Sequence, residues 1–139
     1  MNTNKDRLWL RAVVAIGLAI SAQPFFAQSR YLSADIPFDF YISERLFPAG
    51  TYTVEPQQNH DAVRLHDNRG NTMFVMTTGL SPNAVNSSRL VFHRYGDTNF
   101  LASIYWQGYK NGRALPTSRI EKRLAGNRST PNPVALQLK

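Results

Sequence analysis

The sequence predicts a mainly β protein: an antiparallel β-sandwich or a small open barrel of six to eight short strands, with one short C-terminal helix. Apolar and polar residues alternate over many short segments, which is the pattern of strands with one buried face. Turn-forming Gly, Pro, Asn and Asp residues separate these segments. The 139 residues include no cysteine, which excludes a disulfide-stapled scaffold and a Cys-based zinc site. The domain therefore depends on its hydrophobic core.

The first 27 residues have the order of a secretory signal peptide. A basic start is followed by nine residues without charge or polar side chains (12–20), and then by small and polar residues up to Ala27. Nine apolar residues are too few to span a membrane, which needs about 20. We expect export to the periplasm or the extracellular space, with cleavage after Ala27; earlier cleavage or an uncleaved anchor are the alternatives. Residues 28–139 then form a single β-domain without a transmembrane span, with a basic helix and tail from about 113.

The clearest alternation covers residues 31–43. Every even position from Leu32 to Ile42 is apolar, and the odd positions are mostly polar. This pattern predicts a strand with one buried face. Pro37 cannot donate a ladder hydrogen bond, so it predicts an edge, a bulge or a bend that divides two shorter strands.

Five further strands are expected before position 107. Residues 72–78 are apolar at odd and even positions, which predicts a strand buried on both faces. The segment 79–88 is rich in Ser, Pro and Asn and predicts a loop, and Asn111-Gly112 predicts a turn. The expected strands are 51–55 with Tyr52 and Val54 inward, 63–66 with Val63 and Leu65 inward, 72–78, and a hairpin of 89–95 with 99–106.

Ser118 and Glu121 have the spacing of a capping box and predict a short helix over 118–125. In this motif the Ser side chain accepts a hydrogen bond from the Glu backbone N–H, and the Glu side chain reaches back. Gly126 is placed to end the helix. Alternating apolar residues at 134–138 predict either a last strand or a frayed end.

Positive charge is concentrated in the C-terminal third. Residues 28–106 carry six basic and seven acidic side chains, whereas residues 107–139 carry seven basic and one acidic, a net charge of +6. Such a field attracts anions and weakens as salt rises. We expect contact with an anionic envelope component or an acidic protein; a solvated face that only aids solubility is the alternative. The residues expected to carry the contact are Arg113, Arg119, Lys122 and Arg123.

Catalytic and metal-binding residue types are present, but they form no recognised motif. His60, His66 and His93 lack the spacing of a standard zinc site. Asp35 and Asp39 lie four apart on one strand face, roughly 13 Å along the strand, which is wide for a paired acid and base. No Gly-x-Ser-x-Gly elbow or Gly-rich phosphate loop occurs. We expect no catalytic residue, no metal and no cofactor.

The segment 92–97 combines aromatic, basic and acidic side chains. Its simplest interpretation is a strand entering a turn, in which Arg94 pairs with Asp97. The alternative is a ligand contact through His93, Arg94 and Asp97.

Three segments together resemble a family of small exported proteins from soil-dwelling Gram-negative bacteria: Ile36 to Tyr41, Leu46 to Val54, and Leu90 to Asp97. The similarity covers most of residues 28–139. The resemblance implies export and a β-fold. No activity is assigned to that family, so the resemblance implies no catalytic residue.

The expected function is therefore non-enzymatic binding or organisation at the cell envelope through the basic C-terminal surface. One alternative is a carrier whose sheets enclose a small apolar ligand. Another is a hydrolase without a recognisable motif, which would depend on His66 or His93. No nucleic-acid partner is expected, because no such motif occurs and export separates the protein from nucleic acids. The carrier's ligand would contact Phe38, Phe40, Phe92 and Trp106.

Overall fold

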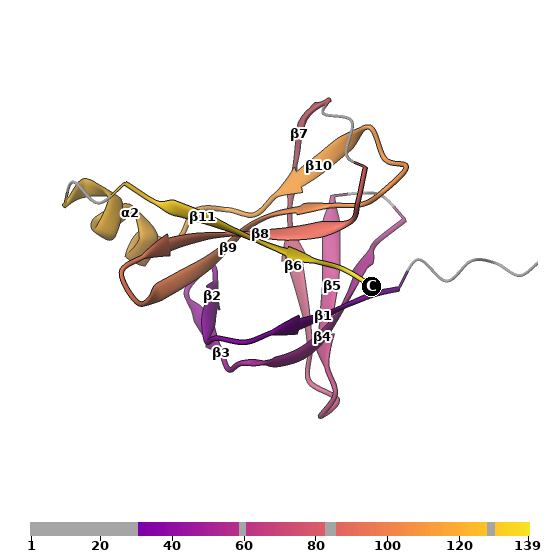
Figure 1. The fold of residues 1–139 in the computed structure, drawn as a ribbon, viewed down its shortest axis with the longest axis horizontal. Coiled ribbons are helices and arrows are strands. Elements are labelled where there is room, and N and C mark those ends of the chain that lie inside the picture. The colour runs from indigo at the N-terminus through magenta and orange to yellow at the C-terminus, as the bar shows by residue number, and fades with distance from the viewer. Residues whose placement is uncertain (1–30, 59–60, 83–85, 128–129) are drawn as a thin grey trace, which may run out of the picture.

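The computed structural model of this protein confirms a β-sandwich with one helix near the C-terminus (Figure 1). The predicted signal segment and His60 lie outside the part of the chain that the structure describes. Within that part, no helix is long and apolar enough to cross a membrane. The described residues are 31–58, 61–82, 86–127 and 130–139.

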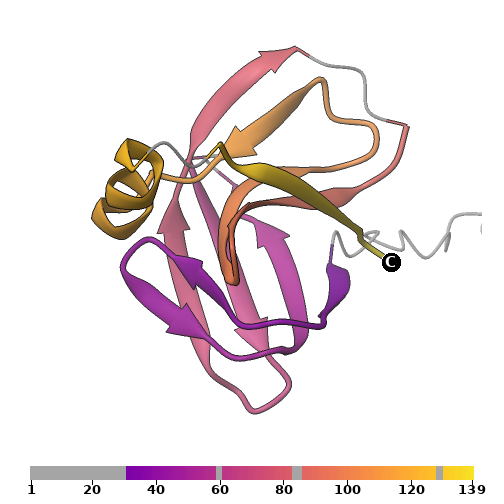
Figure 2. The same ribbon diagram turned by 60° about the vertical axis from the view of Figure 1, so that its left-hand side comes forward.

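Two sheets face each other, with the helix at one end (Figure 2). Sheet A has four strands in the order β1-β4-β5-β6. Sheet B has the order β11-β8-β9-β10-β7, and the β2–β3 hairpin joins it where Tyr41 pairs with Phe100 in parallel. The other pairs are antiparallel. The elements are β1 (Leu32–Ile36), β2 (Phe40–Ile42), β3 (Arg45–Phe47), β4 (Gly50–Pro56), β5 (Ala62–Asp67), β6 (Thr72–Met76), β7 (Thr78–Pro82), β8 (Arg89–Tyr95), β9 (Thr98–Tyr105), β10 (Asn111–Ala114), α2 (Arg119–Gly126) and β11 (Asn132–Gln137).

The predicted strand at 31–43 divides at Pro37, as the sequence indicates. Its first half, β1, joins sheet A, and its second half, β2, joins sheet B. The apolar positions keep their alternation across the bend, and Ile36 and Phe40 on either side of it are both buried. This segment therefore connects the two layers of the sandwich.

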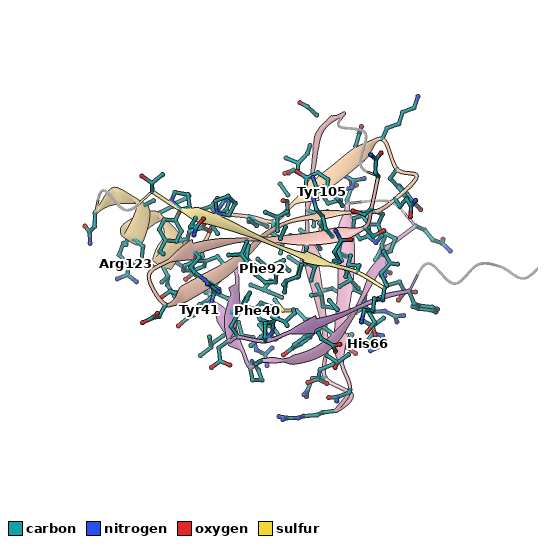
Figure 3. The ribbon with its side chains drawn as sticks, in the orientation of Figure 1. Phe40, Tyr41, His66, Phe92, Tyr105 and Arg123 are labelled. Atoms are coloured by element: carbon teal, nitrogen blue, oxygen red, sulfur yellow. The ribbon has the colours of Figure 1, made fainter. Side chains whose placement is uncertain are left out.

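Aromatic rings fill the space between the sheets. Phe40 and Phe92 are fully buried and meet edge to face, with ring centroids 5.5 Å apart (Figure 3). Tyr52 from sheet A packs against Phe40 at 5.2 Å. Contacts of this kind contribute beyond their buried area. The residues predicted to face inward on β4 and β5 are all buried: Tyr52, Val54, Val63 and Leu65.

The C-terminal segment adds a strand and closes one side of the sandwich. β11 pairs with β8 along its length, so the alternation at 134–138 marks a strand and not a frayed end. Beyond it, Lys139 and Ser33 of β1 exchange two backbone hydrogen bonds of 2.9 and 3.0 Å. The C-terminus consequently lies beside β1 (Figure 1).

The prediction that residues 72–78 are buried on both faces is wrong. β6 is an edge strand of sheet A, and Phe74 and Met76 are 61% and 65% exposed. Val75, on the other face, is buried. Sheet B covers only one face of sheet A, so side chains on the other face of β6 stay exposed although they are apolar.

Two predicted irregular segments are strands. Part of the expected loop 79–88 belongs to β7, which pairs with β10. Asn111-Gly112 opens β10, and the turn lies before it, where Gly108 has a φ of 83°. These short strands, with β3, raise the number in the described residues to eleven, above the expected six to eight.

Candidate functional site

Helix α2 starts where the capping signal predicts. The Ser118 hydroxyl accepts a hydrogen bond from the Glu121 backbone N–H at 2.9 Å. The reciprocal half of the predicted capping box is replaced, because the Glu121 side chain bonds to sheet B. Glu44, in the β2–β3 turn, accepts from the Arg119 backbone N–H at 2.7 Å. Two oxygens from different elements therefore cap the helix.

Glu121 holds the helix against the outer face of sheet B. Its side chain is only 7% exposed, and one carboxylate oxygen lies 2.7 Å from Nδ1 of His93 on β8. The Tyr95 hydroxyl also donates to this carboxylate, and burial followed by the charge of Glu121 raises the pKa of the Tyr95 phenol. A buried carboxylate needs such partners. These contacts fix which side of α2 faces inward.

The opposite side of α2 carries three basic residues at the i, i+3, i+4 spacing of one helix face. Arg119, Lys122 and Arg123 are all exposed, and Figure 3 places Arg123 at one end of the molecule. With Glu44 they line a surface hollow of about 580 Å³, here called the basic hollow. Nε of Arg119 lies 3.8 Å from a Glu44 oxygen. Among the described residues that line the hollow, three cations thus face one carboxylate.

Arg113, the fourth residue expected on this surface, does not lie there. It belongs to β10 and lines a different pocket, together with Trp106 and Tyr109. The turn between β9 and β10 and the helix α2 lie at opposite ends of the molecule (Figure 1). The basic residues of the C-terminal third therefore do not form one continuous surface.

The candidate set His93, Arg94 and Asp97 is not gathered around one point. His93 contacts the buried carboxylate under α2. Arg94 donates from Nε to the Asn99 side chain at 2.7 Å, and its guanidinium lies over the Phe38 ring at 5.0 Å. Asn99 thus takes the position expected for Asp97 as the partner of Arg94. Asp97 is exposed in the β8–β9 turn.

The histidines that a hydrolase would use are also apart. His66 lies on β5 in sheet A, whereas His93 lies on β8 in sheet B. Asp67, next to His66, accepts hydrogen bonds from Asn71, which hold the pKa of the Asp67 carboxyl below its usual value. Across the ranges that the structure describes, no group of three His, Cys, Asp or Glu residues could hold a metal ion.

Comparison with known protein families, curated proteins and solved structures finds no match to this chain. The family resemblance noted in the sequence stays a prediction.

Proposed function

We propose that this protein is an exported, non-enzymatic β-domain that binds an anionic component of the cell envelope through the basic hollow. One observation carries the proposal: a helix held by a buried glutamate on its inner face presents three cations together on its outer face. Arginine and lysine side chains bind phosphate and carboxylate groups through charge-assisted hydrogen bonds.

The basic face is unfavourable for the helix itself. Like charges three and four positions apart destabilise a helix by about 0.2–0.5 kcal/mol a pair. Arg119 also lies in the first turn, where the helix dipole disfavours a cation, whereas Arg123 lies in the last turn, where the dipole favours one. Glu44 offsets part of this cost at Arg119. A bound anion would offset the rest, which supports a binding role over a purely solvated face.

The carrier alternative has less support from the core. Three of the rings expected to line a ligand site contact one another, since Phe38 and Phe40 both meet Phe92 edge to face at 5.2 and 5.5 Å. A ligand between them would have to separate these rings. The fourth, Trp106, borders the pocket that also contains Arg113.

Binding of the full chain to anionic vesicles and to a soluble polyuronate tests the proposal. We expect association with at least one of these polyanions that weakens steeply as salt rises, and none with neutral vesicles. The double change Lys122→Glu and Arg123→Glu should reduce this affinity at least tenfold. Absence of binding to either polyanion at low salt contradicts the proposal.

A matched control separates the hollow from the net charge. Arg69→Glu with Lys139→Glu makes the same change in net charge at exposed positions outside the hollow. This control should keep most of the affinity. Equal losses in both double variants would show a general charge effect and overturn the proposal.

Export is tested on the same protein. We expect mature material in the exported fraction of a Gram-negative host, with a mass that corresponds to a chain starting at Gln28. Intact chain held in the inner membrane would instead support the uncleaved anchor.

A further inference from the structure

A second pocket lies at the turn between β9 and β10. Figure 1 shows this turn at the end of the molecule opposite α2. The volume of the pocket is about 220 Å³, and the pocket is bordered by both sheets, because Pro56 ends β4 of sheet A. We call it the aromatic pocket. Its lining residues are Pro56, Trp106, Tyr109, Lys110, Asn111 and Arg113.

Two aromatic rings form a preformed wall of this pocket. Trp106 is buried, and its ring centroid lies 6.3 Å from that of Tyr109, with the planes tilted by 55°. The turn that carries them is closed by a hydrogen bond from the Tyr109 N–H to the Trp106 carbonyl at 3.2 Å, and Gly108 supplies the positive φ. A rigid wall lowers the ordering cost of binding.

The indole N–H of Trp106 is buried without a hydrogen-bond partner among the described residues. Leaving such a donor unpaired costs about 1–3 kcal/mol, and most buried polar groups avoid this cost. The indole nitrogen has almost no accessible surface, so it offers the pocket no donor, and Trp106 contributes to the pocket through its ring.

Lys110 and Arg113 give the pocket a positive charge. The described residues that line it include no carboxylate. Lys110 is exposed and Arg113 is half-buried. A Cβ atom at Gly79 of β7 would lie 3.6 Å from Nη1 of Arg113, so the guanidinium packs against the Gly79 backbone, where no side chain intervenes. The carboxylate of Glu55, beside the pocket residue Pro56, already pairs with Arg64.

We propose that the aromatic pocket binds a small organic anion consisting of one ring and a carboxylate. The ring packs on Trp106 and Tyr109, and the carboxylate bonds to Lys110 and Arg113. The volume lies below the roughly 300–1,000 Å³ of pockets for drug-sized ligands, which favours a single-ring ligand. This site is independent of the basic hollow.

Trp106 provides the readout, since the chain has only one other tryptophan, Trp9. The full chain with Trp9→Phe is titrated with phenylacetate and with its neutral isostere phenylacetamide, and Trp106 fluorescence is followed. We expect a saturable change with phenylacetate and at least tenfold weaker binding of phenylacetamide. An equal response to both compounds, or a change that does not saturate, overturns the proposal.

Variants that replace a cation with glutamine then locate the site. Lys110→Gln with Arg113→Gln should lower the affinity for phenylacetate at least tenfold, and the exposed Lys110→Gln alone should lower it severalfold without risk to folding. Lys122→Gln with Arg123→Gln, in the basic hollow, should leave the affinity for phenylacetate within twofold of that of the unchanged protein. Equal weakening by both double variants overturns the proposal and leaves the envelope-binding function untouched.

Discussion

Glu121 connects the sequence signal for a helix to the surface that the helix presents. Its backbone N–H is capped by Ser118, and its carboxylate lies against His93 and Tyr95 of β8. A single residue thus starts the helix and orients it. The capping pattern in the sequence reveals the first role, but not the second, because His93 lies 28 positions earlier in the chain.

Replacing Glu121 with Gln should lower the pKa of Tyr95 towards its ordinary value of 10.0. The charge of Glu121 opposes ionisation of the phenol, and the neutral amide removes that charge while keeping an acceptor. The raised pKa also contributes stability that is present below pH 10 and is lost as the pH rises through the folded-state pKa. An ultraviolet titration compared with Tyr95→Phe measures this shift. An unchanged Tyr95 titration in Glu121→Gln would contradict the contact.

Gly112 is required by the packing of its neighbour. A Cβ atom there would clash with the ring of Tyr105, which also contacts Arg89. We expect Gly112→Ala to destabilise the fold by about 1–3 kcal/mol in denaturant unfolding. Gly126→Ala is the matched control, since a Cβ atom meets nothing within 4 Å there. Equal stability of the two variants would be inconsistent with the tight contact.

At the scale of elements, the β2–β3 turn and α2 build the basic hollow together. Ser43 in this turn has a φ of 54°, and the turn brings Glu44 to the start of the helix. Glu44 and Arg119 are 75 positions apart. No local pattern in the sequence connects them, which is why Glu44 was not among the predicted site residues.

Glu44→Gln should strengthen binding to anionic vesicles severalfold. The amide keeps an acceptor for the Arg119 N–H but removes the Glu44 carboxylate from the basic hollow. Vesicle binding over a range of salt concentrations measures the effect, with Glu55→Gln at the Arg64 ion pair as a control outside the hollow. An affinity equal to that of the unchanged protein would mean that the hollow is not the contact.

Ser118→Ala should cost about 1 kcal/mol of stability, the usual value for an N-cap. Thermal or denaturant unfolding measures this loss. Because Glu44 also caps the helix, we expect α2 to persist and vesicle binding to change little. Complete loss of the helix signal in circular dichroism would show that the second cap contributes nothing.

At the scale of the whole molecule, alternation predicts which residues are buried better than which strands are neighbours. The sequence locates the crossing between the sheets at Pro37. This prediction needs only the missing backbone N–H of proline and the burial of the even positions on one face. The exposure of Phe74 depends on which face of sheet A is covered, and the strand at 78–82 depends on its pairing with β10. Arg113 and Arg123 belong to the same basic segment of the sequence, but in the fold they line different pockets. The sequence gives the net charge of the C-terminal third, but only the fold decides on which surface each basic residue lies.

The core should account for a large part of the stability. Phe40 is fully buried against rings from both sheets, so we expect Phe40→Ala to cost about 3–5 kcal/mol. Phe74→Ala, on the exposed edge of sheet A, should cost much less. Denaturant unfolding of the two variants compares them, and similar losses would contradict the assigned interior.

We propose that α2 and the β2–β3 turn form the surface that binds an anionic envelope component. Amide hydrogen exchange of the full chain, with and without anionic vesicles, tests this proposal. We expect added protection at Arg119–Gly126 and at Ser43 and Glu44, and we expect high salt to remove this protection. Protection confined to other surfaces, such as the turn between β9 and β10, would contradict the proposal.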